Sequence, residues 1–222
     1  PLRAVVTALL LVLVGAGACV AWRVATARRV DRAYTSRQVR AADGVVVGAE
    51  SFTLTGTNGR ALLLLHGSGD TPQTLRFLAH RLHVAGYTVH APLLPGHGRR
   101  PRDFVHVSAR AYLAAARHAL DQLGGEYGWV GVAGLSMGGA LAAQLAAESP
   151  AVRVLMLLVP YLVPPPAVAW AARSAPLWGL VQPFVDGRGD ESVQDPAARD
   201  KGYAYGVFPP AALRAMVQTA SA

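Results

Sequence analysis

The 222-residue sequence predicts an α/β domain in which a mainly parallel β-sheet carries helices on both faces. Short apolar runs alternate with longer segments whose apolar residues follow a helical period, and this alternation indicates parallel strands joined by helices. An apolar stretch precedes the pattern, and a segment rich in proline and aromatic residues follows it. The chain therefore divides into a membrane anchor or signal segment (1–27), a linker (28–48) and the α/β domain (49–222), with a cap over about 160–222.

Composition narrows the class of protein. Hydrophobic residues make up 52% of the chain and charged residues 15%, which excludes a disordered protein and is typical of a chain partly placed in a membrane. The formal net charge is +8, but residues 1–40 carry +6 of it and the remainder is nearly balanced. No basic surface interleaved with aromatic residues is left for nucleic acid, so we expect no such partner. The single cysteine, Cys19, excludes an intrachain disulfide and a cysteine-type metal site.

The apolar segment from residue 4 to residue 24 contains one charge, Arg23, and about 20 such residues suffice to cross a bilayer. Trp22 and Arg23 would then lie at the membrane interface. We prefer a single-pass anchor, which places the protein at a membrane. A signal peptide cleaved after residues 16–18, giving a secreted protein, and a lipoprotein signal ending at Cys19 are the alternatives. The arginines that follow favour a cytoplasmic carboxyl side, although the orientation stays open.

The first half of the domain predicts two strands and a helix. Residues 51–54 alternate as a strand, and residues 57–59 carry a tight-turn signal. Residues 61–65 form an uninterrupted apolar run, which is typical of a central strand buried on both faces. Thr71 and a proline after it offer a cap and the first position of a helix that ends at Gly86.

Three more strands and two helices are expected next. Strands are predicted at 87–91, 129–135 and 152–159. A helix capped by Ser108 ends at the glycine pair 124–125, and a helix of small residues covers 137–147. From residue 160 onward, prolines and aromatic residues predict a cap over a pocket rather than a further core strand, with a short final helix at 210–217.

The run Gly134-Leu135-Ser136-Met137-Gly138 fits the Gly-x-Ser-x-Gly pattern of a nucleophile elbow. The turn from strand to helix in such an elbow is so sharp that side chains at the two glycine positions would collide with their neighbours. Here the run directly follows a predicted strand and opens a predicted helix, as the pattern requires. The sequence therefore predicts that Ser136 is a catalytic nucleophile.

A second motif, His66-Gly67-Ser68-Gly69, follows the central strand. An acyl-transfer enzyme must stabilise an oxyanion with backbone N–H groups that are already in place. One donor is expected from Met137, the residue after the nucleophile, and the other from the loop after an earlier strand, here Ser68. Gly67 would let that loop approach closely, and we expect the Ser68 hydroxyl to cap a backbone group.

These motifs resemble the carboxylesterase and monoacylglycerol-lipase branch of the α/β hydrolases. The resemblance covers roughly residues 50–160 and rests on five ordered runs, 62–69, 72–75, 86–89, 92–98 and 134–139. It implies hydrolysis of carboxylic esters that have an apolar acyl group, with no metal, no organic cofactor and a small cap. It also implies that His66 orders the oxyanion loop and that His97 orders the loop Pro95-Gly96-His97-Gly98, so that neither is the general base.

The chain departs from this family after Ser136, because its last histidine is His118. A serine hydroxyl is a weak nucleophile without a base, and the fold's order is nucleophile, acid, then histidine. We expect the final strands, with the acid and the histidine, to be missing from this piece, which alone would be inactive. The alternative is a non-catalytic module that binds an apolar ligand or partner. The acids that do follow are expected in the cap: Asp186, Asp190, Glu191, Asp195 and Asp200.

Overall fold

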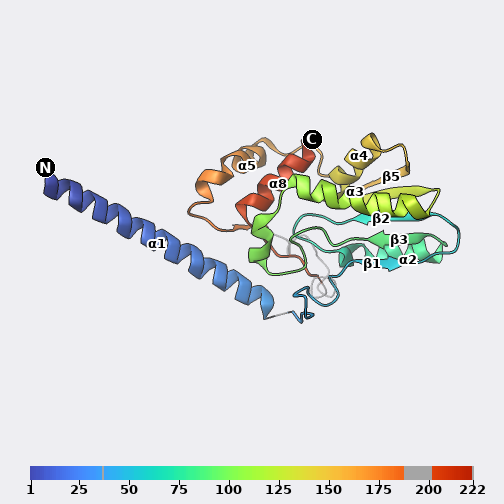
Figure 1. The fold of residues 1–222 in the computed structure, drawn as a ribbon, viewed down its shortest axis with the longest axis horizontal. Helices are drawn as coiled ribbons and strands as arrows, with labels where there is room; N and C mark the ends of the chain where they lie inside the picture. The colour runs from blue at the N-terminus through green and yellow to red at the C-terminus, as the bar shows by residue number, and fades with distance from the viewer. Residues whose placement is uncertain (37, 188–201, 222) are drawn as a thin grey trace.

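The computed structural model describes residues 1–36, 38–187 and 202–221. Its main sheet has five strands in the spatial order β1-β3-β2-β4-β5, with β1 antiparallel to β3 and every other pair parallel. The expected α/β class with a mainly parallel sheet is therefore confirmed (Figure 1). The strands are β1 Phe52–Leu54, β2 Ala61–Leu65, β3 Thr88–Ala91, β4 Val130–Leu135 and β5 Val152–Leu158.

Strand β2 lies in the middle of the sheet, as its unbroken apolar sequence predicts. All five of its residues are buried, and it pairs with β3 on one side and β4 on the other. Side chains alternate along a strand, so Leu63 and Leu65 enter one core cluster and Leu64 enters the other. The turn signal at 57–59 does not join paired strands, because β3 lies between β1 and β2.

Helices cover both faces of the sheet. Helices α3 (Ala109–Glu126) and α4 (Met137–Glu148) share one core cluster with Leu63 and Leu65, and α2 (Arg76–Val84) packs with Leu64 on the other face. Ser108 caps α3 as expected, since its Oγ accepts the Ala111 N–H at 3.2 Å. Helix α3 continues through both of its glycines to Glu126 rather than ending at them.

The start of the helix near Thr71 differs from the expectation. Its first turn is the 3-10 helix η1 (Pro72–Leu75), and Thr71 occupies the cap position without a hydrogen bond from its hydroxyl. Asp70 holds this turn in a different way, because its Oδ1 accepts the Thr71 N–H at 2.8 Å and the Thr74 hydroxyl at 2.6 Å. These bonds are local side-chain contacts rather than a helix cap.

Helix α1 (Leu2–Thr35) is a single helix of 34 residues that projects from the domain, with the N-terminus at its far end (Figure 1). It is long and apolar enough to cross a membrane, and none of the residues in its most apolar 18-residue window is buried. The helix also runs through 28–35, a part of the chain that we expected to be linker. Tertiary packing accounts for the additional helical turns, because they lie against the domain, where Asp31 and Tyr34 are buried.

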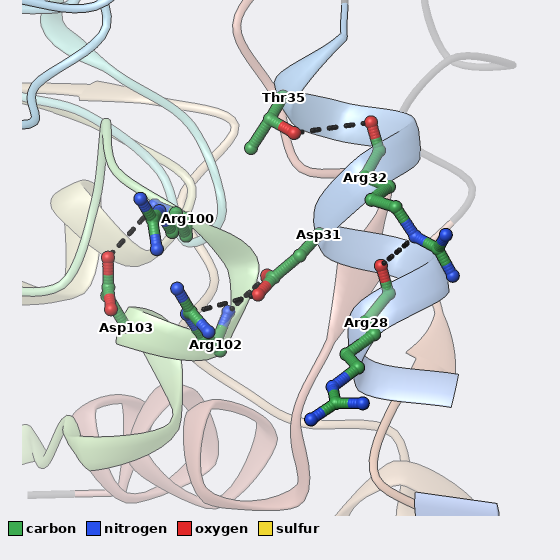
Figure 2. Close-up of polar contacts among 7 residues, drawn as sticks. All are labelled: Arg28, Asp31, Arg32, Thr35, Arg100, Arg102 and Asp103. Atoms are coloured by element: carbon green, nitrogen blue, oxygen red, sulfur yellow. Dashed lines mark hydrogen bonds and ion pairs between the residues drawn. The ribbon is translucent and has the colours of Figure 1, made fainter. Parts of the chain in front are cut away.

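The contact at the end of α1 centres on the 3-10 helix η2 (Pro101–His106). Asp31 forms an ion pair with the Arg102 Nε at 3.1 Å and accepts the Arg102 backbone N–H at the same distance. Figure 2 shows the Asp31 carboxylate reaching from α1 toward Arg102, while Arg28 and Arg32 lie along the helix. The carboxyl end of α1 is thereby held against the domain.

Within the described residues, the chain after residue 160 adds no strand to the main sheet. It contains α5 (Pro166–Trp178), a separate antiparallel pair of β6 (Val185–Asp186) with β7 (Val207–Phe208), and α8 (Pro210–Ala220). Helix α8 does more than cap a pocket, because Ala212 and Ala215 belong to the main core cluster. Asp186 lies in β6, whereas the other expected cap acids fall outside the described residues: Asp190, Glu191, Asp195 and Asp200.

Candidate active site

Ser136 lies at the junction of β4 and α4, where the sequence places the elbow. Its backbone has φ +52° and ψ −117°, a region that L-residues rarely adopt. Backbone hydrogen bonds hold it there: its N–H donates to the Leu158 carbonyl at 3.0 Å, and its carbonyl accepts the Tyr161 N–H at 3.0 Å. Strain of this kind persists only when the surroundings fix it, and it concentrates at functional sites.

The two glycines that flank Ser136 are required by close backbone packing. A Cβ on Gly134 would lie 2.0 Å from the Gly138 carbonyl oxygen, and a Cβ on Gly138 would lie 2.1 Å from the Leu65 carbonyl oxygen. Both distances are far below van der Waals contact, and the obstructing atoms are backbone. The elbow can therefore close only with glycine at both positions.

The loop after β2 lies beside the elbow. A Cβ on Gly67 would come 3.5 Å from the Cβ of Ser136, so the loop faces the serine at close range. The N–H groups of Ser68 and Met137 donate no hydrogen bond to any described residue. For Met137 this follows from helix geometry, since the first N–H groups of a helix lack intrahelical acceptors. Both expected oxyanion donors are thus uncommitted.

The side chain of Ser68 does not behave as expected. Its Oγ is buried and has no hydrogen-bond partner among the described residues, so it caps no backbone group. Ser68 lines the cavity above Ser136, and its hydroxyl is therefore an unpaired polar group at the site. A buried unpaired hydroxyl carries a free-energy cost that a bound ligand can remove.

His66 is fully buried and acts on the oxyanion loop. Its Nδ1 lies 2.9 Å from the Gly67 carbonyl oxygen and its Nε2 accepts the Leu94 N–H at 3.0 Å. These partners fix the tautomer with the proton on Nδ1. Burial lowers the pKa of His66 to about 4, so the ring is neutral at pH 7.

His97 holds the next residues of the same loop. Its Nε2 accepts the Gly69 N–H at 3.0 Å, and its Nδ1 lies 3.0 Å from the Pro95 carbonyl oxygen. Burial, followed by the nearby His66, lowers its pKa well below the usual value. The Nε2 lone pairs of both histidines are used by backbone N–H groups, which leaves neither free to take a proton from Ser136. The two rings meet edge to face at a centroid distance of 4.8 Å.

Tyr205 supports this loop from the cap side, a role that no local sequence pattern predicts. Its backbone N–H donates to the Gly69 carbonyl at 2.9 Å. Both backbone polar groups of Gly69 are therefore hydrogen-bonded, the N–H to His97 and the carbonyl to Tyr205. Its hydroxyl donates to the Gly96 carbonyl at 2.9 Å and accepts the Arg99 N–H at 3.0 Å. The edge of the Tyr34 ring, from α1, contacts it at a centroid distance of 5.0 Å.

A cavity of about 1270 Å³ opens above Ser136 and the oxyanion loop. Much of its wall is apolar, and the wall residues come from the sheet edge, from α2 and from the cap. Val159 at the end of β5 also has a positive φ of 44°, which is unusual for a β-branched residue. The larger aliphatic and phenyl side chains in the wall are those of Leu54, Phe77, Leu135, Val159, Val207 and Phe208.

No described histidine forms a hydrogen bond with Ser136, although His80 lines the same cavity. The described residues also contain no group of three or more His, Cys, Asp or Glu side chains placed to hold a metal ion. The site as described therefore consists of a strained serine, two free N–H groups and an apolar cavity.

Comparison with known proteins identifies relatives of this site. A sequence model of the family described as Serine aminopeptidase, S33 matches residues 57–202. A carboxylesterase of Bacillus subtilis (strain 168) is 32% identical over 116 residues, which are 52% of this chain and 47% of the esterase. A thermostable monoacylglycerol lipase of Bacillus sp. (strain H-257) is 37% identical over 107 residues, or 48% of this chain and 42% of the lipase.

A comparison with solved structures supports the same relationship. The structure reported for LipS and LipT, two metagenome-derived lipolytic enzymes, matches with a TM-score of 0.69 and 29% identity, over 78% of this chain and 69% of that one. The resemblance drawn from the sequence motifs is therefore confirmed. The chain spans a little under half the length of the two curated relatives, at 47% and 42%.

Proposed function

Because the chain belongs to the Serine aminopeptidase, S33 family of α/β hydrolases, we propose that it is a serine hydrolase that cleaves carboxylic esters with an apolar acyl group. The observation that carries the proposal is the strained backbone of Ser136 opposite Gly67, with two uncommitted N–H groups beside it. A binding module would have no use for a strained serine. The apolar cavity wall supports an apolar acyl group.

In the proposed reaction, the Ser136 Oγ attacks the ester carbonyl carbon while a general base takes its proton. The Ser68 and Met137 N–H groups stabilise the oxyanion, and its collapse forms the acyl-enzyme and releases the alcohol, which receives the proton. Water then hydrolyses the acyl-enzyme by the same steps. The Nε2 atoms of His66 and His97 are occupied by backbone N–H groups, and no described histidine, His80 included, has a hydrogen bond to Ser136. We therefore propose that the base and its acid belong to a part of the full-length protein beyond residue 222.

The experiment uses the full-length protein and a fluorophosphonate probe, which reacts with activated serines. We expect labelling and hydrolysis of p-nitrophenyl butyrate, both abolished by Ser136→Ala. Ser149→Ala is the matched control, because Ser149 lies at the far end of α4. We expect the 222-residue chain alone to hydrolyse the ester negligibly. Labelling that persists in Ser136→Ala would overturn the assignment of the nucleophile.

A non-catalytic module that binds an apolar ligand is the second candidate, favoured by the apolar cavity wall and by the lack of a hydrogen bond from any described histidine to Ser136. The same experiment separates the two functions. Full-length protein that binds a fatty-acid ester but neither reacts with the probe nor turns the ester over would support the binding module and contradict the hydrolase.

We also propose that α1 anchors the protein in a membrane, with secretion after signal cleavage as the alternative. The length of the helix and its exposed apolar surface support the anchor. The molecular mass of the mature protein distinguishes the two, because cleavage after residue 18 removes most of the apolar segment. An anchored chain also stays with the membrane pellet after alkaline carbonate washing.

A further inference from the structure

A second cavity, of about 660 Å³, lies between α1, η2, α5 and α8 and shares no lining residue with the cavity above Ser136. We call it the α1–α8 groove. Because the two cavities are separate, binding in this groove is independent of the proposed hydrolase activity, whereas the source of the ligand rests on the proposed membrane anchor. A volume of this size is within the usual range for a bound small molecule.

The walls of the groove are mainly apolar. Helix α5 and the turn after it supply Pro176 and Leu180, and Phe184 closes the wall next to them. Val105 and Val107 contribute from the other side, in and just after η2. Such walls suit an extended hydrocarbon chain, which binds by burying apolar surface rather than by hydrogen bonds.

Three arginines from three elements line the same groove: Arg23 of α1, Arg102 of η2 and Arg214 of α8. No Asp or Glu is among the described residues that line it. Arg102 is paired with Asp31, as Figure 2 shows, and Arg23 donates to the Gly179 carbonyl. Within the described part of the chain, neither Arg23 nor Arg214 has a carboxylate partner. An apolar groove lined by uncompensated positive charge fits a ligand with a hydrocarbon chain and an anionic head.

The position of the groove points to the source of that ligand. Arg23, Val24 and Ala27 belong to the turns of α1 at the carboxyl end of its apolar segment. With α1 in a bilayer, this part of the helix lies at the level of the lipid head groups. We propose that the α1–α8 groove binds an anionic phospholipid, with an acyl chain against α5 and α8 and the phosphate on Arg23 and Arg214.

The test is native mass spectrometry of the full-length protein released from detergent micelles that contain a single added lipid. The probes are palmitoyl-oleoyl phosphatidylglycerol, phosphatidylcholine with the same two chains, and oleate. We expect phosphatidylglycerol to bind about tenfold more tightly than phosphatidylcholine, because only its head carries a net negative charge. Oleate tests whether a fatty acid, rather than a phospholipid, is the occupant.

Two variants locate the binding. Arg214→Gln removes an exposed charge from the groove and should weaken phosphatidylglycerol binding about fivefold. Ala211→Trp should block the chain, with urea unfolding used to verify that this variant is folded. Arg110→Gln, on the exposed surface of α3 and outside the groove, is the control and should bind normally.

Equal binding of the two phospholipids would overturn the proposal, as would an Arg214→Gln variant that binds like Arg110→Gln. Binding of oleate without phosphatidylglycerol would overturn the assignment to a phospholipid. Since Ser136 is outside the groove, Ser136→Ala should bind phosphatidylglycerol unchanged, so loss of hydrolysis and loss of lipid binding remain distinguishable.

Discussion

Ser136 and Ser68 show how single residues prepare this site before any substrate arrives. Ser136 holds a positive φ, and the two glycines around it have backbone atoms where a Cβ would lie. Ser68 contributes an N–H that is free of other partners. Oxyanion donors act through the backbone, so their effect depends on the N–H group and not on the side chain.

A pair of substitutions at Ser68 separates these two parts of the residue. In the full-length protein, Ser68→Pro removes the N–H group and should lower kcat for p-nitrophenyl butyrate by about 10²–10³. Ser68→Ala keeps the N–H and should retain kcat within about threefold, since only an unpaired hydroxyl is lost. Equal losses in the two variants would argue that the side chain, not the N–H group, acts in catalysis.

At the scale of elements, the carboxyl end of α1 meets the segment that precedes β7 beside the loop that follows β2. Tyr34 donates its hydroxyl to the Tyr203 carbonyl at 2.9 Å, and its ring contacts Tyr205. Tyr205 in turn holds the loops at Gly69 and Gly96. Helix α1 is therefore connected to the site through packed side chains and hydrogen bonds.

Tyr205→Phe tests how much this connection contributes to stability. The substitution leaves the ring in place but removes the partner of the Gly96 carbonyl and of the Arg99 N–H. We expect the free energy of unfolding to fall by about 1–3 kcal/mol, measured by urea denaturation. Tyr203→Phe is the control, because the Tyr203 hydroxyl has no hydrogen bond among the described residues, and it should change stability little. If both variants unfold at the same urea concentration, the Tyr205 hydroxyl is not a structural link.

At the scale of the whole molecule, two neutral histidines are buried in the core of the site. The pKa of His66 falls from 6.5 to about 4 on folding because burial penalises its charged form, and that of His97 falls in the same direction. Between pH 6.5 and pH 4 the unfolded chain therefore binds more protons than the folded one. Stability contributed by the neutral rings is complete above pH 6.5 and is lost as the pH falls toward 4.

We therefore expect the free energy of unfolding to drop when the pH is lowered from 7 to 5, by about 2 kcal/mol for His66 alone. The carboxyls of Asp31 and Asp70 act in the opposite direction, because burial raises their pKa values. Comparison with His66→Gln isolates the histidine: urea unfolding at several pH values should show a weaker pH dependence in this variant. His118→Gln, on the exposed side of α3, should keep the pH dependence of the native chain.

The sequence by itself determined the parts of this protein that depend on local patterns. An unbroken apolar run marks β2, helical periods mark α2 and α3, and Gly-x-Ser-x-Gly marks the elbow. These features are readable because strand burial, helix periodicity and a sharp turn each restrict residues that are close together in the chain. The α/β class and the position of Ser136 follow from them.

Only the tertiary structure decided how distant residues meet. Gly67 faces Ser136, Tyr205 holds Gly69, and Asp31 of α1 pairs with Arg102, although the residues of each pair are far apart in the sequence. No periodic pattern or short motif around Tyr205 or Arg102 predicts these contacts, because their partners lie far away in the chain. Their partners are chosen when the core closes, because burial and hydrogen bonding then select one arrangement among many.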